Sequence, residues 1–349
     1  MLNNRAGSGT TVVAATVLGL LILFPFIVAF LDGQSLADVL ANESGNSKFY
    51  QGLLVEVFIL ALYALSYDLL LGVTGLLSFG HAMFFAVGAY ATGIALKTLR
   101  LELLPTLGLV LIAAIAQALL FSIVLPRVKG ITFALVTLGF AAVFEVVIQS
   151  HELSAFAGGD VGIQNVPKPA YLNPAEQRLA FYFVALAVIV LAYGFYRRFL
   201  DSPTGRVCVA IRENEARAKM LGFSTFYFKL VALIVSSITA ALAGVLHALY
   251  QPIVSPTVGG LGFTVAALLI ILIGGVGTLS GALVGAAVYR LMQFYLDRFF
   301  GEASSYLLGI VYVALVLFLP YGIIGTWRAR SAGWRAAWTR RLAKAPQEK

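Results

Sequence analysis

Hydrophobic residues form long blocks separated by short polar segments along most of this chain. Each block is about 20 residues long, which is the length that an α-helix needs to cross the hydrocarbon core of a membrane. The alternating pattern of membrane β-barrel strands is not seen. We therefore expect an all-α, polytopic integral membrane protein with about ten transmembrane helices, at residues 11–31, 52–72, 80–97, 103–125, 131–150, 179–196, 229–250, 262–276, 278–296 and 305–325.

The composition agrees with this interpretation, because 60% of the 349 residues are apolar and only 11% are charged. A soluble domain carries about 25% charged residues, so this chain cannot build a surface that faces water on all sides. Cys208 is the single cysteine and cannot form an internal disulfide. No Cys or His spacing indicates a metal site, and the three histidines lie on different segments, so we expect neither a metal nor a catalytic centre.

The charged residues are distributed unevenly, and their positions predict the orientation of the chain. The formal net charge is +8, which in a membrane protein records topology more often than nucleic-acid binding. With ten spans and the N-terminus inside, most Lys and Arg residues fall in inside segments and most acids fall outside. This is the bias of the positive-inside rule, so we expect both termini in the cytoplasm. Residues 11–31 are not followed by a cleavage site of small residues, which predicts an uncleaved first helix.

We expect one transmembrane permease domain over residues 1–326, with two long loops and a tail. The outside loop, residues 151–178, contains glycines and prolines that predict an irregular segment over the mouth of a pathway. The inside loop, residues 197–228, is too long and too polar to be a simple turn. Residues 327–349 predict a basic amphipathic tail at the cytoplasmic membrane surface, because arginines there surround Trp327, Trp334 and Trp338.

A glycine-rich segment runs from Gly75 to Tyr90, between the second and third predicted spans. Small residues let helices approach closely, and glycine near the end of a span allows the backbone to break where it lines a cavity. Ser78 and His81 would be the polar groups at such a break. The same spacing also fits tight helix packing in which His81 bonds to a backbone carbonyl, and the pattern alone leaves both interpretations open.

The inside loop carries a turn signal followed by an amphipathic pattern. Pro203 and Gly205 favour a turn, and the residues after them predict a short helix that ends at Gly222. Glu213 and Glu215 would lie in the first part of this helix, where acidic groups suit the positive end of the helix dipole. Such a helix fits a groove on a cytoplasmic partner, and it also fits a basic helix at the lipid headgroups.

A third segment, Gly274-Gly275-Val276-Gly277, divides the eighth and ninth predicted spans. It resembles a phosphate-binding loop only superficially, because no Lys-Ser/Thr pair follows it and no other nucleotide-binding signature occurs in the chain. We therefore expect no cofactor and no ATP hydrolysis by this chain itself. The glycines predict a tight bend or a re-entrant turn, although close packing of two small-residue helices would explain them as well.

Charged residues within predicted spans should face protein or water, since each costs about 3 kcal/mol at the centre of a span. Their positions allow a proton relay, but scattered charges without matched spacing favour structural roles. The residues concerned are Glu56, Asp68, Glu145 and Arg290.

The order and spacing of four of these segments resemble branched-chain amino-acid ABC transporter permeases of the LivM type. The resemblance extends over about residues 50–325, and its most specific part is the inside segment Ser202–Gly222. Even there the match to the importer pattern Glu-Ala-Ala-x-x-x-Gly is loose, because Glu215 is displaced by one position. Asp68 also departs from the family pattern, in which Asn is expected. The other three segments are Gly75–Tyr90, Gly158–Ile163 and Gly274–Gly285.

The resemblance implies the type II-like architecture of ABC importer permeases, and it assigns roles to individual positions. It implies an ATPase-coupling helix that carries Arg212, Glu213, Glu215, Ala218 and Gly222. It implies a translocation path beside Ser78, Gly80, His81, Tyr90, Gly159 and Asp160. It implies a helix break at Gly274, Gly275 and Gly277.

The resemblance further implies a subunit of the bacterial inner membrane that moves Leu, Ile or Val, or related hydrophobic amino acids, by alternating access. Its partners would be a second homologous permease, two cytoplasmic ATPase subunits that bind ATP-Mg, a periplasmic substrate-binding protein and membrane lipid, with no nucleic acid. Closely similar permeases serve urea and short amides, so the substrate stays open between these classes. An ion-coupled secondary transporter, the alternative from another class, would use Glu56, Asp68 and Glu145 and would need no partners.

Overall fold

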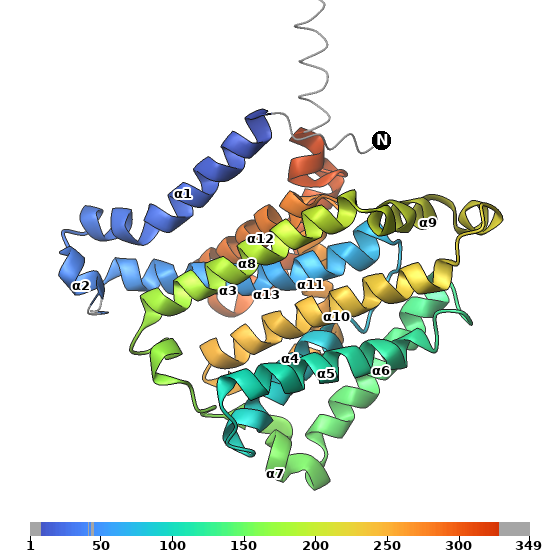
Figure 1. Cartoon of the computed structure of the whole chain (residues 1–349). Helices are drawn as coiled ribbons and strands as arrows, with labels where there is room; N and C mark the ends of the chain where they lie inside the picture. Colours follow the sequence, from blue (N-terminus) through green and yellow to red (C-terminus); the bar gives the residue numbers. More distant parts are fainter. Residues whose placement is uncertain (1–7, 41, 43–44, 328–349) are drawn as a thin grey trace, which may run out of the picture.

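A computed structural model of the chain describes residues 8–40, 42 and 45–327 (Figure 1). The predicted tail at residues 327–349 therefore lies outside the described residues, apart from Trp327. Within the described part the structure is almost entirely helical, and its one sheet has two short strands. The expectation of an all-α chain is confirmed for these residues.

Each of the ten predicted membrane segments contains a helix. Short 3₁₀-helices lie in the loops: η2 (His151–Leu153), η3 (Gly159–Val161), η4 (Ala170–Leu172), η5 (Pro256–Gly259) and η6 (Gly301–Ala303). The longer elements follow the chain in the order α1 (Ser8–Leu31), α2 (Leu36–Leu40), α3 (Asn46–Asp68), the π-helix η1 (Leu69–Val73), α4 (Ala82–Lys97), α5 (Leu103–Ser122), α6 (Ile131–Gln149), α7 (Ser154–Ala157), β1 (Ile163–Gln164), α8 (Arg178–Asp201), α9 (Pro203–Met220), α10 (Thr225–Tyr250), β2 (Ile253–Val254), α11 (Leu261–Gly274), α12 (Leu279–Phe300) and α13 (Ser304–Phe318).

Six of the described helices are long and apolar enough to cross a membrane, namely α1, α3 with η1, α5, α6, α8 and α10. α11 and α12 pass the same test only when they are taken together, and the chain bends by 112° at the break between them. If the pair is counted as one span, it is the seventh. α4 and α13 are apolar but shorter. The chain is therefore a polytopic membrane protein, and the expected number of ten spans requires these last four helices to be counted separately.

α3 lies at the centre of the bundle, where it packs against α8, α10 and α12, while α4 packs against α10 and α5. The backbones of α4 and α10 approach closely. A Cβ atom on Gly88 would overlap the carbonyl oxygen of Ala241, and one on Gly244 would overlap the carbonyl oxygen of Phe85. Glycine at such positions is how helices in a membrane come close enough to pack backbone against backbone.

Two membrane helices are interrupted. α3 continues into η1, which ends at Val73 before a non-helical segment that reaches α4. α11 ends at Gly274 and α12 begins at Leu279, with φ of +121° at Gly275 and +75° at Gly277. Positive φ values of this kind favour glycine. The glycines of this segment therefore form a sharp turn between two helices.

α2 and α9 lie at opposite ends of the bundle (Figure 1). The 151–178 loop contains short helices and β1, which pairs antiparallel with β2 from the segment after α10, so that Ile163 faces Val254. Nζ of Lys97 also donates a hydrogen bond to the carbonyl oxygen of Gln164 at 2.8 Å. The loop that was expected to be irregular is thus attached to the ends of α4 and α10.

Candidate functional site

α9 is the segment for which coupling to a partner is predicted, and it begins directly after α8. Ser202 caps this helix, since its Oγ accepts a hydrogen bond from the backbone N of Gly205 at 3.2 Å, and Pro203 takes the first helical position. Both residue types are favourable at a helix N-terminus. The turn predicted at these residues is therefore wrong, because the residue types that favour a turn serve here to start a helix.

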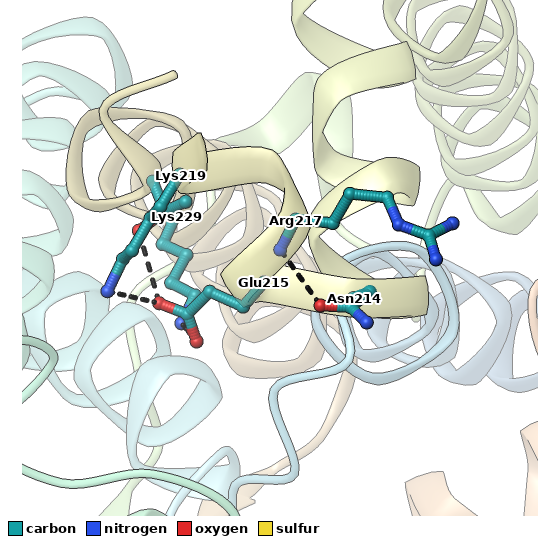
Figure 2. Close-up of polar contacts among 6 residues, drawn as sticks. Asn214, Glu215, Arg217, Lys219 and Lys229 are labelled. Atoms are coloured by element: carbon teal, nitrogen blue, oxygen red, sulfur yellow. Dashed lines mark hydrogen bonds and ion pairs between the residues drawn. The ribbon is translucent and has the colours of Figure 1, made fainter. Parts of the chain in front are cut away.

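Asn214 divides α9 into two parts. Its backbone is non-helical, with φ −161° and ψ 98°. Its Oδ1 accepts a hydrogen bond from the backbone N of Arg217 at 2.9 Å, which is the bond of a capping residue (Figure 2). Glu215 is consequently the first residue of the second part, whereas Glu213 ends the first part. The sequence predicted a single short helix and gave no sign of this division.

The carboxylate of Glu215 lies between two lysine ammonium groups (Figure 2). Its Oε2 is 2.8 Å from Nζ of Lys229 on α10, its Oε1 is 3.2 Å from Nζ of Lys219, and Oγ1 of Thr225 donates to Oε1 at 3.1 Å. Partial burial acts to raise the pKa of Glu215, but the hydrogen bonds and positive charge of Lys229, with the bonds from Lys219 and Thr225, lower it to about 2. Glu215 is therefore ionised at neutral pH and joins the second part of α9 to the start of α10.

A depression of about 370 Å³ lies beside this carboxylate, between the loop after α5 and the junction of α9 with α10. Three lysines and one glutamate line it, which makes it electropositive. Sequence reasoning singled out neither Lys129 nor Lys229, because they come from separate segments and no local pattern joins them. The apolar part of the lining consists of Leu125, Pro126, Phe223 and Phe226.

The end of α9 displays apolar side chains. Met220 is 81% exposed and Leu221 is 71% exposed, and Gly222 follows them with φ +87° and open space around it. Glu213 is exposed on the same helix, whereas Ala218 is buried. Exposed apolar residues gathered at one tip are a candidate contact surface for another protein.

Arg212 reaches away from this tip to the interruption after α3. Its Nη1 donates a hydrogen bond to the carbonyl oxygen of Gly72 in η1. Oδ1 of Asp68 accepts a hydrogen bond from the backbone N of Gly277 at 2.7 Å. Asp68 is fully buried, and its Oδ2 has no hydrogen-bond partner within the described part of the chain. A predicted coupling residue, a residue of the predicted helix break and Asp68 are thus brought together.

His81 lies in a closed polar and aromatic cluster. Its Nε2 is 2.8 Å from Oγ of Ser66, and its ring lies against those of Tyr63 and Tyr67, with centroids 5.4 and 4.7 Å away. The Tyr67 hydroxyl donates to the carbonyl oxygen of Ser78 at 3.0 Å. Both His81 and Ser78 are buried.

The residues that the resemblance assigns to a translocation path do not meet at one place. Ser78, Gly80 and His81 lie together before α4, and Tyr90 lies further along that helix. Gly80 packs so closely on Thr137 that a Cβ would overlap its carbonyl oxygen. Two others, Gly159 and Asp160, belong to η3 in the outer loop. Of the six residues, only Asp160 is exposed on the surface. The other five are buried within this subunit.

Glu56 of α3 and Arg290 of α12 form an ion pair inside the bundle, and Nε2 of Gln251 donates to Oε1 of Glu56 at 3.4 Å. The two charged residues are 234 positions apart, so no sequence pattern could pair them. Glu145 is half-buried on α6. Over residues 8–40, 42 and 45–327, no group of three His, Cys, Asp or Glu side chains could hold a metal ion.

Interrupted membrane helices beside buried polar groups occur in many membrane transport proteins, and the chain shares this feature with that class. A family model described as the permease component of branched-chain amino acid transport systems matches residues 49–319, so the chain belongs to this family. The resemblance to branched-chain amino-acid permeases seen in the sequence is confirmed.

Known relatives include two proteins called high-affinity branched-chain amino acid transport system permease protein LivM. The one from Salmonella typhimurium is 29% identical and the one from Escherichia coli is 28% identical, each over 74% of this chain and 66% of the relative. The permease protein LivH of Salmonella typhimurium is 24% identical over 76% of this chain and 91% of the relative. The chain thus spans about two thirds of the length of these LivM proteins. No solved structure matches it.

Proposed function

We propose that this chain is the permease subunit of an ATP-driven importer that moves Leu, Ile, Val or related hydrophobic amino acids by alternating access. The observation that carries the proposal is the family match over residues 49–319, together with relatives named for high-affinity branched-chain amino acid transport. A further support is that the sequence holds no nucleotide-binding signature, so an ATP-driven cycle needs separate motor subunits.

The proposed assembly contains a second homologous permease, two cytoplasmic ATPase subunits that bind ATP-Mg, and a periplasmic substrate-binding protein, in the inner membrane of a bacterium. The relatives support the second permease, since both LivM and LivH are named as permease proteins of a high-affinity branched-chain amino acid transport system. The proposed topology has ten spans with both termini inside. The positions of α2 and α9 at opposite ends of the bundle agree with one part of this topology, in which the segment after the first span lies outside and the segment after α8 lies inside.

In this assembly α9 is the coupling segment. Its exposed tip, Met220 to Gly222, is the proposed contact with an ATPase subunit, because apolar side chains exposed to water at a helix end are stabilised by a partner. Glu213 is exposed at the end of the first part of α9, before Asn214. Glu215 and Ala218 support the tip from within, through the lysine contacts and through burial.

The contacts of the charged residues favour an importer over an ion-coupled secondary transporter. Glu56 is paired with Arg290, and one oxygen of Asp68 is bonded to Gly277, so these carboxylates have structural partners. Transport of urea or short amides by the same class of importer is the remaining alternative for the substrate, and the binding protein would decide between the two.

The test is purification in mild detergent with the products of neighbouring genes, followed by reconstitution in liposomes. We expect an ATPase to co-purify and ATP to drive uptake of leucine. Gly222→Trp should abolish co-purification, whereas Gly33→Trp should not, since Gly33 also has positive φ and open space but lies near α2 at the other end. Uptake by this chain alone on an ion gradient would overturn the proposal. If the cognate binding protein binds urea but not leucine, the proposed substrate is urea instead.

A further inference from the structure

We infer that Arg212 is the positioning residue that transmits movement of α9 to the interrupted helices α3 and α11, so that its loss uncouples ATP hydrolysis from transport. The inference rests on the proposed importer function and assigns to this residue a role other than contact with the ATPase. It is carried by four features of the contacts around its guanidinium group.

The first feature is the direction of the side chain. Arg212 belongs to the exposed surface of α9, yet its Nη1 donates to the carbonyl oxygen of Gly72. Carbonyls in the last turn of a helix lack partners within the helix and carry partial negative charge. A guanidinium group is a suitable partner for such a carbonyl, since it is always charged and presents its donors in a rigid plane. The contact therefore joins a surface helix directly to the end of a membrane helix.

The second feature is the space left by glycines. A Cβ on Gly277 would lie 2.9 Å from Nη1 of Arg212 and 2.9 Å from the carbonyl oxygen of Gly72. A Cβ on Gly75 would lie 3.1 Å from Cγ of Arg212. Two separate turns, after η1 and between α11 and α12, thus leave room for the same side chain. Displacement of this side chain would disturb both turns.

The third feature is the position of Asp68. Its carboxyl group is fully buried and accepts a hydrogen bond from the backbone N of Gly277 through Oδ1. A Cβ on Gly72 would meet both Oδ1 of Asp68 and the backbone N of Gly277. The carbonyl group that Arg212 contacts therefore belongs to a residue that packs against the Asp68–Gly277 hydrogen bond.

The fourth feature is the division of α9 at Asn214. Arg212 lies before the division and donates to the carbonyl oxygen of Gly72 in η1, whereas Glu215 lies after it and contacts Lys229 of α10. α9 is thus attached to the bundle on both sides of the kink. Arg212 is the attachment that leads to the interrupted helices, so a push on the tip reaches them through this residue.

The experiment uses the complete importer in liposomes with its binding protein, and compares Arg212→Met and Arg212→Lys with the wild type. For Arg212→Met we expect an assembled complex that hydrolyses ATP but transports at least about tenfold fewer substrate molecules per ATP, with an unchanged half-saturating substrate concentration. Arg212→Lys should recover part of the coupling, because it keeps the charge. Arg206→Met is the matched control, an exposed arginine earlier on α9, and should behave as the wild type.

A second variant disturbs the Asp68–Gly277 hydrogen bond, which lies beside the Arg212 contact, from the membrane side. A Cβ on Gly72 would overlap Oδ1 of Asp68 and crowd the backbone N of Gly277. Gly72→Ala should therefore uncouple transport while leaving the outer surface of α9, and co-purification of the ATPase, intact. If Arg212→Met prevents assembly of the importer, Gly72→Ala tests the inference in its place. Normal coupling in Gly72→Ala, or in an assembled Arg212→Met complex, would overturn the inference while leaving the importer function in place.

Cys208 supplies a readout that does not depend on transport. It lies one turn before Arg212, is fully buried, and its Sγ is 3.7 Å from the carbonyl oxygen of Phe228. Burial raises the pKa of this thiol to about 11, so alkylation at neutral pH should be slow. We expect Arg212→Met to accelerate alkylation of Cys208 by about fivefold or more, because α9 loses an attachment to the bundle. An unchanged rate would show that Arg212 does not hold α9 in place. Absence of ATP-driven uptake by the wild type would instead contradict the proposed function.

Discussion

α1 and α3 are both apolar enough to cross a membrane, but they occupy opposite environments. The span in α1 is the more apolar of the two, yet only 11% of its most apolar 18-residue window is buried, whereas 83% of that window is buried in the span of α3 and η1. α1 carries no charged residue between Val12 and Leu31, while α3 carries Glu56 and Asp68. In this protein the less apolar helix is the central one, because charged groups are tolerated only where protein surrounds them. Hydropathy alone identifies a span, and its polar residues indicate whether protein or lipid covers it.

The largest expected effect comes from adding a side chain where two helices pack backbone against backbone. The same change on the exposed helix α1 is the comparison. Gly88→Leu should destabilise the protein by more than about 3 kcal/mol or prevent folding, because α4 and α10 leave no room for a Cβ there. Gly19→Leu on α1 should change stability by less than about 0.5 kcal/mol, because nothing lies within 4 Å of its Cβ position. The two variants are compared by the yield of monodisperse protein and by the melting temperature in detergent. Equal melting temperatures would contradict the contrast between the packed interior of the bundle and the exposed α1.

An intermediate effect is expected at the ion pair that joins α3 to α12. Arg290→Met should cost about 2–3 kcal/mol, because it leaves the Glu56 carboxylate without a cation inside the bundle. The double variant Glu56→Gln with Arg290→Met should recover most of the loss, to within about 1 kcal/mol of the wild type, since both charges are then absent. Thermal unfolding of the four members of this cycle measures the coupling. If the two losses simply add, the pair does not stabilise the fold.

The smallest effect is expected at Glu215, at the edge of the bundle. Glu215→Gln should cost about 0.5–1 kcal/mol at neutral pH, as expected for a partly exposed ion pair. The pKa of Glu215 is lowered from 4.5 to about 2 in the folded chain, so its contribution is complete above pH 4.5 and is lost as the pH falls toward 2. Melting temperatures across that interval should therefore fall more steeply for the wild type than for the variant. Parallel pH profiles would exclude this contribution.

The periodic features of the fold could be predicted from the sequence. Every predicted span became a helix, and the glycines of residues 274–277 became a turn, because span length and backbone freedom are local properties of the chain. The turn predicted at the start of α9 is wrong for a local reason as well. Ser202, Pro203 and Gly205 favour both a turn and a helix cap, and only the position of α8 shows which one forms.

The contacts of the site depend on pairings between distant segments. Arg212 and Gly72, Glu56 and Arg290, and Glu215 and Lys229 each come from different helices. No spacing within the sequence records these pairs, so Arg212 could be assigned only to the surface of a coupling helix. The kink at Asn214 was missed because asparagine is unremarkable in a polar segment, although its place three residues before Arg217 fits a capping residue.

The π-helix η1 determines how far the chain must rotate to release Arg212. Five residues, Leu69–Val73, are wound more loosely here than in the α-helix that precedes them. Tightening this winding by one residue would turn everything after it by about 100°, since an α-helix completes a turn in 3.6 residues. The Gly72 carbonyl would then point away from the guanidinium group. A change in winding number, without any lateral shift of α3, is sufficient to break the Arg212 contact, while Glu215 still joins α9 to Lys229 of α10.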